Sequence, residues 1–212
     1  MLQINFQKTS NDNYLKLFDL QSPLPLDNSV LESKIELDLG HDKYDLITSF
    51  EMYETLTGTN NDRYQYVLPN YNFSRNFNSK TLNGWFNFNS TGSNMLNNTN
   101  VITSSVINDL KYTASNNISD NGIKTNFNIL LKNINSVGKN TTIYKNSPQS
   151  ELMSSYAYNA SLPLSKKTPR TFNTLEPKLS LRFSPHEMKN NTDTARRIDV
   201  NNIFLSDRLN LD

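Results

Sequence analysis

Few residues of this chain have the types and spacings that could carry covalent chemistry or hold a metal. The two histidines are His41, in a predicted tight turn, and His186, directly after Pro185. Neither has a serine or carboxylate at the spacing of a catalytic motif, and we interpret both as solvated. Residues 117–122 partly match a calcium loop, but Asn128 occupies the position that needs a bidentate glutamate. We therefore predict no catalytic residue, no metal site and no cofactor.

The composition excludes further classes of function. The chain has 21 Lys and Arg against 20 Asp and Glu, and this balance argues against a nucleic-acid binder, which would show a basic excess. The absence of cysteine excludes disulfides, zinc–thiolate sites and a cysteine nucleophile. With 34 Asn and only 4 Ala, the chain is poorly suited to helix. It has no apolar run of the roughly 18 residues that a membrane helix needs, and its first residues do not form a signal peptide.

Alternation of apolar and polar residues recurs along the chain and predicts strands with one apolar and one polar face. The alternating stretches are 30–39, 44–54, 71–77, 82–88, 123–132, 152–162 and 175–184. In the last stretch, Leu179, Leu181 and Phe183 share one face, and Lys178, Ser180 and Arg182 share the other. The polar faces are rich in hydroxyls and amides and carry mixed charges, which suits a water-filled lumen or a polar partner better than a dry core.

The predicted strands are long, about 10–14 residues against a usual length of about 5–6. The connections between them alternate in length. The short ones are 40–42, 78–80, 120–122 and 165–170, and the longer ones are 10–29, 55–62, 90–100, 136–150 and 185–200. Aromatic residues gather near segment ends. Together these features predict an all-β, antiparallel up-and-down meander that forms a partial transmembrane β-barrel of about ten strands. A soluble β-sandwich or β-solenoid is the alternative from periodicity alone, and an Asn-rich prion-like tract is a third.

Three stretches resemble the barrel domain of the LPS-assembly protein LptD family, also called the organic-solvent-tolerance protein family. The first stretch is 10–18, which is similar to the family's Ser-Asp-Asp-x-Tyr segment. The second is 67–73 with 82–88, which is similar to the family's Pro-containing strand and its Gly-Trp strand. The third is 174–183 with 202–209, which is similar to the family's Glu-Pro strand and its Asp-Arg segment. The residues that carry these motifs are expected to be structural. They are Asp12, Tyr14, Pro69, Gly84, Trp85, Glu176, Pro177, Asp207 and Arg208.

The resemblance implies that residues 1–212 are part of one outer-membrane β-barrel domain. The piece would lack the family's N-terminal jelly-roll and both barrel-closing ends, and with them the lateral gate. The implied function is lipopolysaccharide transport and assembly in the outer membrane of a Gram-negative bacterium, without covalent catalysis. The implied partners are lipopolysaccharide, an LptE-like lipoprotein plug, outer-membrane lipid, and a periplasmic bridge protein reached through the missing N-terminal domain. Another outer-membrane barrel, such as a porin-like channel or receptor, and a soluble β-rich adhesin or binding module remain the alternatives.

Overall fold

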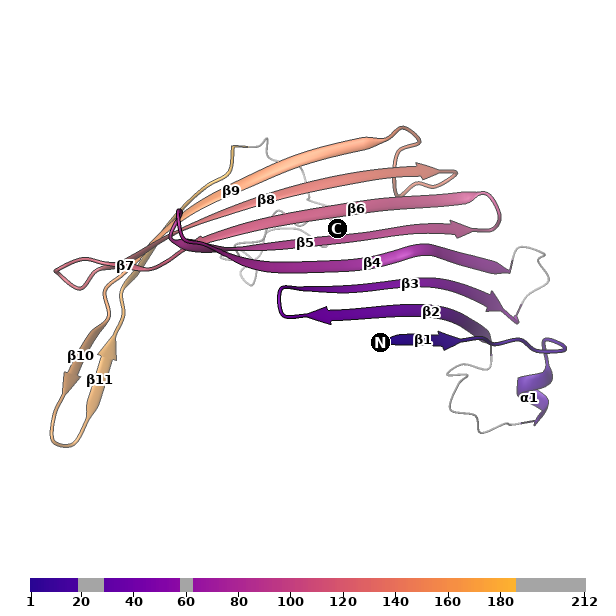
Figure 1. Cartoon of the computed structure of the whole chain (residues 1–212), viewed down its shortest axis with the longest axis horizontal. Helices are drawn as coiled ribbons and strands as arrows, with labels where there is room; N and C mark the ends of the chain where they lie inside the picture. Colours follow the sequence, from indigo (N-terminus) through magenta and orange to yellow (C-terminus); the bar gives the residue numbers. More distant parts are fainter. Residues whose placement is uncertain (19–28, 58–62, 186–212) are drawn as a thin grey trace. The chain divides into compact units, whose positions relative to one another are not determined.

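The structure, a computed structural model, describes residues 1–18, 29–57 and 63–185, and its regular secondary structure is almost entirely strand (Figure 1). Its elements are β1 (Leu2–Asn5), α1 (Tyr14–Phe18), β2 (Val30–His41), β3 (Tyr44–Thr55), β4 (Tyr64–Ser79), β5 (Gly84–Asn97), β6 (Val101–Ala114), β7 (Asn117–Ile118), β8 (Lys124–Lys139), β9 (Gln149–Ser161), β10 (Leu164–Lys167), β11 (Phe172–Leu175) and β12 (Lys178–Phe183). No helix within these described ranges is both long and apolar enough to cross a membrane. The prediction of an all-β chain is confirmed.

The strands form an antiparallel meander. Within the described residues, one ten-stranded sheet has the order β1-β2-β3-β4-β5-β6-β8-β9-β12, with β7 paired to β8, and β10 and β11 form a separate two-stranded hairpin. The strands β2 to β6, β8 and β9 are 12 to 16 residues long, so the prediction of long strands is also confirmed. Most neighbours in the sheet are neighbours in sequence, as expected of an up-and-down arrangement.

The predicted connections are only partly right. The segment 120–122 closes a hairpin, with Gly122 at φ +77° and Asn117 paired to Thr125. The predicted long loop 90–100 is wrong, because β5 continues to Asn97 and a three-residue turn leads into β6. Its Ser, Thr, Gly and Asn residues are typical of loops, but here they pair in the sheet, and the amide of Asn94 donates to the carbonyl of Leu68 at 3.0 Å.

The predicted single strand 175–184 is also wrong in its continuity. At Glu176 and Pro177 the chain passes from the two-stranded hairpin to the ten-stranded sheet, so that β11 pairs with β10 while β12 pairs with β9. Proline has no backbone N–H to donate to a sheet ladder, which explains why the strand divides at this point. The alternation of β12 itself is as predicted, because Leu181 lies opposite Tyr158 and Arg182 opposite Ala157.

The chain divides into two compact units, which we describe separately. Unit 1 comprises Met1–Asn76, Phe88–Asn108 and Ile134–Glu151; unit 2 comprises Phe77–Asn87, Asp109–Asn133 and Leu152–Asp212. Unit 1 has a small apolar cluster in which Leu15 of α1 packs with Leu31 of β2 and Leu56 just after β3. The backbone N–H of Leu56 also donates to the carbonyl of Ser29 at 2.7 Å. The Leu15 contacts place the short helix beside the start of β2 and the end of β3.

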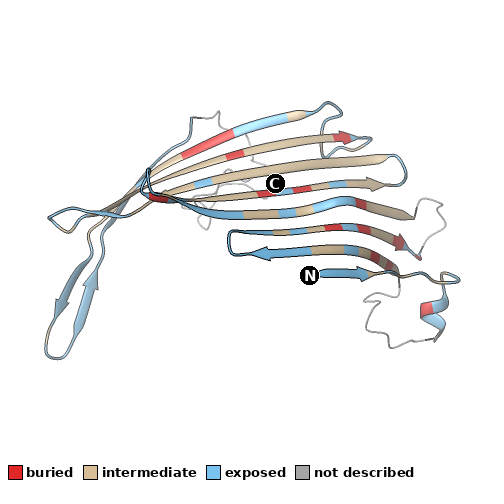
Figure 2. Ribbon diagram, viewed as in Figure 1, coloured by how far each residue is buried: buried red, intermediate tan, exposed pale blue. Residues whose placement is uncertain are grey.

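Few positions along the strands are buried (Figure 2). In the described residues, polar side chains outnumber apolar ones among the buried positions, and these polar residues are Ser33, Ser49, Glu51, Glu54, Ser90, Lys132, Ser154 and Ser155. Large apolar side chains are instead exposed; for example, Phe50 is 48% exposed and Leu181 is 60% exposed. The sheet therefore does not enclose an apolar core of the usual kind.

A β-bulge in β4 changes which residues share a face. Between the pairs Ser49–Asn70 and Glu51–Val67, β4 carries one residue more than β3, and Pro69, after a cis peptide bond, lies in this bulge. Side chains on a strand alternate, so one extra residue reverses the parity. Tyr66 and Tyr71, whose numbers differ in parity, therefore lie on the same face of β4.

Several sequence predictions fall on residues whose structure is not described. His186, Asp207 and Arg208 lie outside the described residues, as do nearly all of the predicted loop 185–200 and parts of the loops 10–29 and 55–62.

Candidate functional site

The apolar face of unit 1 is defined by Ile35, Leu37 and Leu39 on β2, Tyr44, Leu46, Phe50 and Met52 on β3, and Tyr64, Tyr66, Tyr71 and Phe73 on β4. Cross-strand pairs fix this grouping, because directly paired residues lie on one face of a sheet. Leu46, for instance, pairs with both Leu39 and Phe73. Rings form a row across this face. His41 stacks on Tyr44 with centroids 5.0 Å apart, and Phe73 lies 6.1 Å from Phe88 of β5.

A short polar chain crosses the same face of unit 1. The hydroxyl of Tyr71 lies 3.2 Å from that of Ser90, and the Ser90 hydroxyl donates to the amide oxygen of Asn108 at 2.7 Å. The Tyr71 ring covers Gly92, where an added Cβ would lie 2.8 Å from the ring carbon Cζ. Hydrogen bonding within the protein satisfies these polar groups, so they can lie on an otherwise apolar surface.

The polar face of unit 1 is defined by Glu32, Lys34, Glu36 and Asp38 on β2 and Asp45, Ser49, Glu51 and Tyr53 on β3. Its contacts centre on Glu51, which is 8% exposed. The carboxylate of Glu51 accepts hydrogen bonds from Ser49 at 2.6 Å and from Tyr53 at 2.8 Å, and the Lys34 ammonium lies 3.8 Å away. The ammonium of Lys34 also pairs with Glu36 at 2.6 Å. This face is a hydrogen-bonded, charged surface.

Unit 2 has two faces of the same kinds. Its apolar face is marked by ring contacts, in which Phe77 stacks on Phe86 at 5.0 Å, Phe86 lies 4.8 Å from Tyr112, and Tyr156 lies 6.5 Å from Phe183. Leu179 and Leu181 of β12 share the parity of Phe183, and both are more than half exposed. The predicted assignment of these three residues to one apolar face is confirmed.

Polar contacts define the opposite face of unit 2. Asp109 of β6 pairs with the buried ammonium of Lys132 on β8 at 3.6 Å. The amide of Asn126 is joined to that of Asn159 on β9 at 2.9 Å, and the Ser180 hydroxyl of β12 donates to Asn159 at 2.7 Å. These contacts place odd-numbered residues of β6 and β9 and even-numbered residues of β8 and β12 on one polar face.

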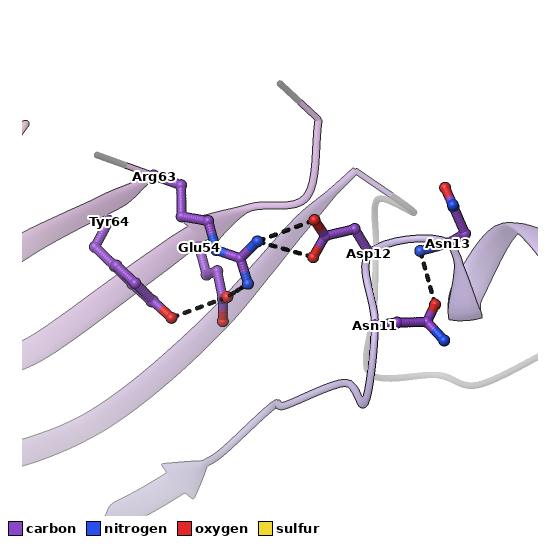
Figure 3. A network of polar contacts seen from close by, with 6 residues as sticks. All are labelled: Asn11, Asp12, Asn13, Glu54, Arg63 and Tyr64. Atoms are coloured by element: carbon purple, nitrogen blue, oxygen red, sulfur yellow. Dashed lines mark hydrogen bonds and ion pairs between the residues drawn. The ribbon is translucent and has the colours of Figure 1, made fainter. Parts of the chain in front are cut away.

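An ionic network lies at the end of β3 and the start of β4 (Figure 3). The guanidinium of Arg63 donates to both carboxylate oxygens of Asp12, at 2.8 and 3.0 Å, and also pairs with Glu54. The Tyr64 hydroxyl donates to the same Glu54 oxygen at 3.0 Å. Arg63 thereby joins the segment before α1 to the end of the sheet. This network orders a terminal segment and has no group arranged as a nucleophile with its base.

The predicted motif residues occupy separate places along the sheet. Asp12 and Tyr14 lie at the α1 segment, where Tyr14 begins the helix, and Pro69 lies in the β4 bulge. Gly84 begins β5 close to Tyr112, where an added Cβ would meet the ring at 2.7 Å, and Trp85 is 46% exposed. Gly84 has a local structural reason for its residue type, because a Cβ there would collide with its neighbours.

The last described motif lies between β11 and β12. The carboxylate of Glu176 pairs with the ammonium of Lys178 at 3.1 Å, and this contact holds the pKa of Glu176 below its ordinary value. The carbonyl of Pro177 accepts a hydrogen bond from the N–H of Leu162 at 3.1 Å, which ties the break in the strand to the end of β9.

Reasoning from the sequence missed Arg63, Glu54 and the Asp109–Lys132 pair. Arg63 follows a stretch predicted as loop, and no local pattern indicates that its partner is Asp12, 51 residues away. The signal for Lys132 was present, because it is a charged residue at a polar-parity position next to an apolar run, but its burial depends on pairing between strands.

Comparisons with known proteins identify no relative. No family model matches the chain, and no curated protein is significantly similar to it.

Proposed function

We propose that this chain is part of a transmembrane β-barrel that transports lipopolysaccharide to the surface of the outer membrane. The observation that carries the proposal is the contrast between two kinds of face: large apolar side chains such as Phe50 and Leu181 are exposed on the apolar faces, while the charged side chains of Glu51 and Lys132 are buried on the polar faces. Barrel strands in a membrane alternate in this sense, with apolar residues toward lipid and polar residues toward a wet lumen.

The energetics favour a lipid environment for the apolar faces. Removing apolar surface from water stabilises by roughly 25 cal/mol per Å², and contiguous apolar patches of more than a few hundred Å² are unusual on soluble monomers. Phe50, Leu181 and Phe183 lie on the apolar faces and are 48 to 63% exposed. The strands of 12 to 16 residues also exceed the roughly 9–11 residues that a tilted strand needs to cross a bilayer.

The cargo is proposed from the resemblance to the LptD family, and the polar faces are compatible with it. A surface of carboxylates, ammonium groups and amides, such as that around Glu51, can solvate sugars and phosphates, while acyl chains remain near the bilayer. On this proposal the protein works in the outer membrane with an LptE-like lipoprotein plug, and receives lipopolysaccharide from a periplasmic bridge protein through a domain N-terminal to the barrel.

The membrane part of the proposal can be tested with two adjacent residues. The chain has no cysteine, so Leu181→Cys and Arg182→Cys each give a single labelling site, on opposite faces of β12. With a fluorophore on each variant in lipid bilayers, we expect brominated acyl chains to quench position 181 and aqueous iodide to quench position 182. Equal quenching of both positions by iodide would contradict a lipid-facing side.

The transport part needs a cellular measurement. Depletion of the protein that contains this chain should lower surface-exposed lipopolysaccharide while its synthesis continues, measured by surface labelling against total lipopolysaccharide. Normal surface display after depletion would exclude the assignment. A defect confined to the uptake of small solutes would favour a porin-like channel or receptor instead.

A further inference from the structure

The polar face of unit 2 carries a marked excess of positive charge. Among the described residues, the strand positions on this face hold five basic side chains, and two carboxylates lie against them: Asp109 pairs with Lys132, and Glu176, just before β12, pairs with Lys178. The basic residues are Lys111 on β6, Lys124 and Lys132 on β8, and Lys178 and Arg182 on β12. We call these five residues the basic face. The whole chain is nearly neutral, at +1, so this excess is a local feature.

Side-chain contacts between strands establish that these residues share one face. The Asp109–Lys132 ion pair joins odd positions of β6 to even positions of β8. The chain of amide contacts from Asn126 through Asn159 to Ser180 joins the even positions of β8 to those of β12. Lys111 has the parity of Asp109, Lys124 that of Lys132, and both charged residues of β12 that of Ser180.

The polar face of unit 1 has the opposite charge. It carries five carboxylates, from Glu32, Glu36, Asp38, Asp45 and Glu51, and one ammonium group, from Lys34. A wet polar surface as such therefore does not require lysine and arginine. The separation of charge between the two polar faces indicates that the basic face interacts with an anion.

The fold fixes the position of one member of the basic face, Lys132. It is 2% exposed, yet its ammonium is held on the polar face against Asp109. A buried cation with a fixed partner has a defined position, and the neutral amides of Asn126 and Asn128 share its face by the parity of β8. Such an arrangement of cations and amide groups suits a phosphate oxyanion.

We propose that the basic face binds the phosphate groups of a phosphorylated glycolipid during its passage along the polar surface. This inference rests on the proposed function, because it assumes that the cargo is a glycolipid and that the polar face lines its path. Charge complementarity selects the phosphate. Each basic residue contributes to the attraction of an anionic lipid, so removing three of them should weaken binding at least tenfold.

The single tryptophan of the chain provides a reporter. Phe86 contacts Tyr112 on the apolar face, so Trp85, one position earlier on β5, lies on the polar face of the same unit. It is 46% exposed and can respond to a ligand through its fluorescence.

The test uses the full chain in lipid nanodiscs and three probes: a bisphosphorylated diglucosamine lipid, the same lipid without phosphates, and inorganic phosphate alone. We expect the unmodified chain to bind the phosphorylated lipid at least tenfold more tightly than either other probe, by Trp85 fluorescence. The triple variant Lys111→Gln, Lys124→Gln, Arg182→Gln should lose this preference. The matched control Lys166→Gln, Lys167→Gln, Arg170→Gln removes the same charge from the β10–β11 hairpin and should keep it.

Several results would overturn the inference: equal affinity for both lipids, a preference that survives in the triple variant, a control that loses as much as the triple variant, or inorganic phosphate that binds as well as the phosphorylated lipid. A charge-retaining variant, Lys111→Arg with Lys124→Arg, should bind like the unmodified chain and controls for misfolding. Normal surface lipopolysaccharide after depletion, together with an intact phosphate preference, would contradict the proposed function but not this inference. Reduced surface lipopolysaccharide after depletion, together with no phosphate preference, would contradict this inference but not the proposed function.

Discussion

The ring of Tyr71 on β4 lies directly over Gly92 on β5, so closely that a methyl group at Gly92 would enter the ring: its Cβ would lie 2.8 Å from Cζ and nearer still to Cε1. The same tyrosine reaches Ser90 through its hydroxyl. Glycine in a strand is entropically unfavourable, and the close approach of the ring is the physical reason for it here.

Gly92→Ala should therefore destabilise the protein by about 1–3 kcal/mol, because the ring must leave its position. The free energy of unfolding in urea would measure it. The nearest atoms all belong to the Tyr71 side chain. In a chain that already carries Tyr71→Ala, Gly92→Ala should therefore lower the free energy of unfolding only slightly further. Gly40→Ala, where the nearest atom is 3.8 Å away, is the neutral control. Additive losses in the double variant would contradict this explanation.

Gly84→Ala should behave differently from Gly92→Ala. Its Cβ would lie 2.5 Å from the backbone carbonyl oxygen of Thr113 as well as 2.7 Å from the Tyr112 ring. A backbone atom cannot rotate away, so we expect a loss of stability at least as large, with no recovery when Tyr112→Ala is added. Recovery in that double variant, measured by the same urea titration, would show that the strands can separate without cost.

Removal of Arg63 should release the α1 segment from the sheet. Arg63→Met leaves the mostly buried carboxylate of Glu54 without its cation, whereas Asp12→Asn removes only the more exposed partner. We expect the order of destabilisation Arg63→Met, then Asp12→Asn, and partial recovery when Glu54→Gln is combined with Arg63→Met. Protease sensitivity of residues 10–18 would report the release. Equal sensitivity of all variants would show that Leu15 alone holds the segment.

The two faces of β12 predict opposite responses to charge. Leu181→Arg places a cation on the apolar face, which near a bilayer midplane is destabilising by about 2–4 kcal/mol, and should impair assembly. Arg182→Leu alters the polar face and should leave assembly intact. Heat-modifiable gel mobility distinguishes assembled from unassembled protein. Impaired assembly in Arg182→Leu alone would mean that the faces are inverted.

The pH response of Glu176 follows from its contact with Lys178. Because the pKa of this carboxyl is lower in the folded protein than in the unfolded chain, its contribution to stability is present above the unfolded pKa and is lost as the pH falls through the folded one. Lys178→Gln should raise the pKa of Glu176 toward its ordinary value, measured by carbon-13 NMR of the side-chain carboxyl. An unchanged titration would show that Lys178 is not the cause.

The sequence by itself determined the alternating faces of several strands, but not the bounds of all of them, since 90–97 continues β5 and 175–184 divides between β11 and β12. Side-chain alternation is a local property, so the opposite orientation of Leu181 and Arg182 could be predicted from parity alone, and the turn at Gly122 from its conformational freedom. The motif residues Pro69, Gly84 and Glu176 could be singled out only through a family resemblance, without a reason for their types.

Only the tertiary structure decided which residues meet across strands. The bulge at Pro69 reverses the parity of β4, and that reversal depends on the pairing with β3, not on any local signal. Likewise, the pairs Asp12–Arg63 and Asp109–Lys132 join residues far apart in the chain. A two-residue period fixes the side of the sheet on which a side chain lies, but the register between strands fixes its neighbours, and register is a non-local property of hydrogen bonding and packing.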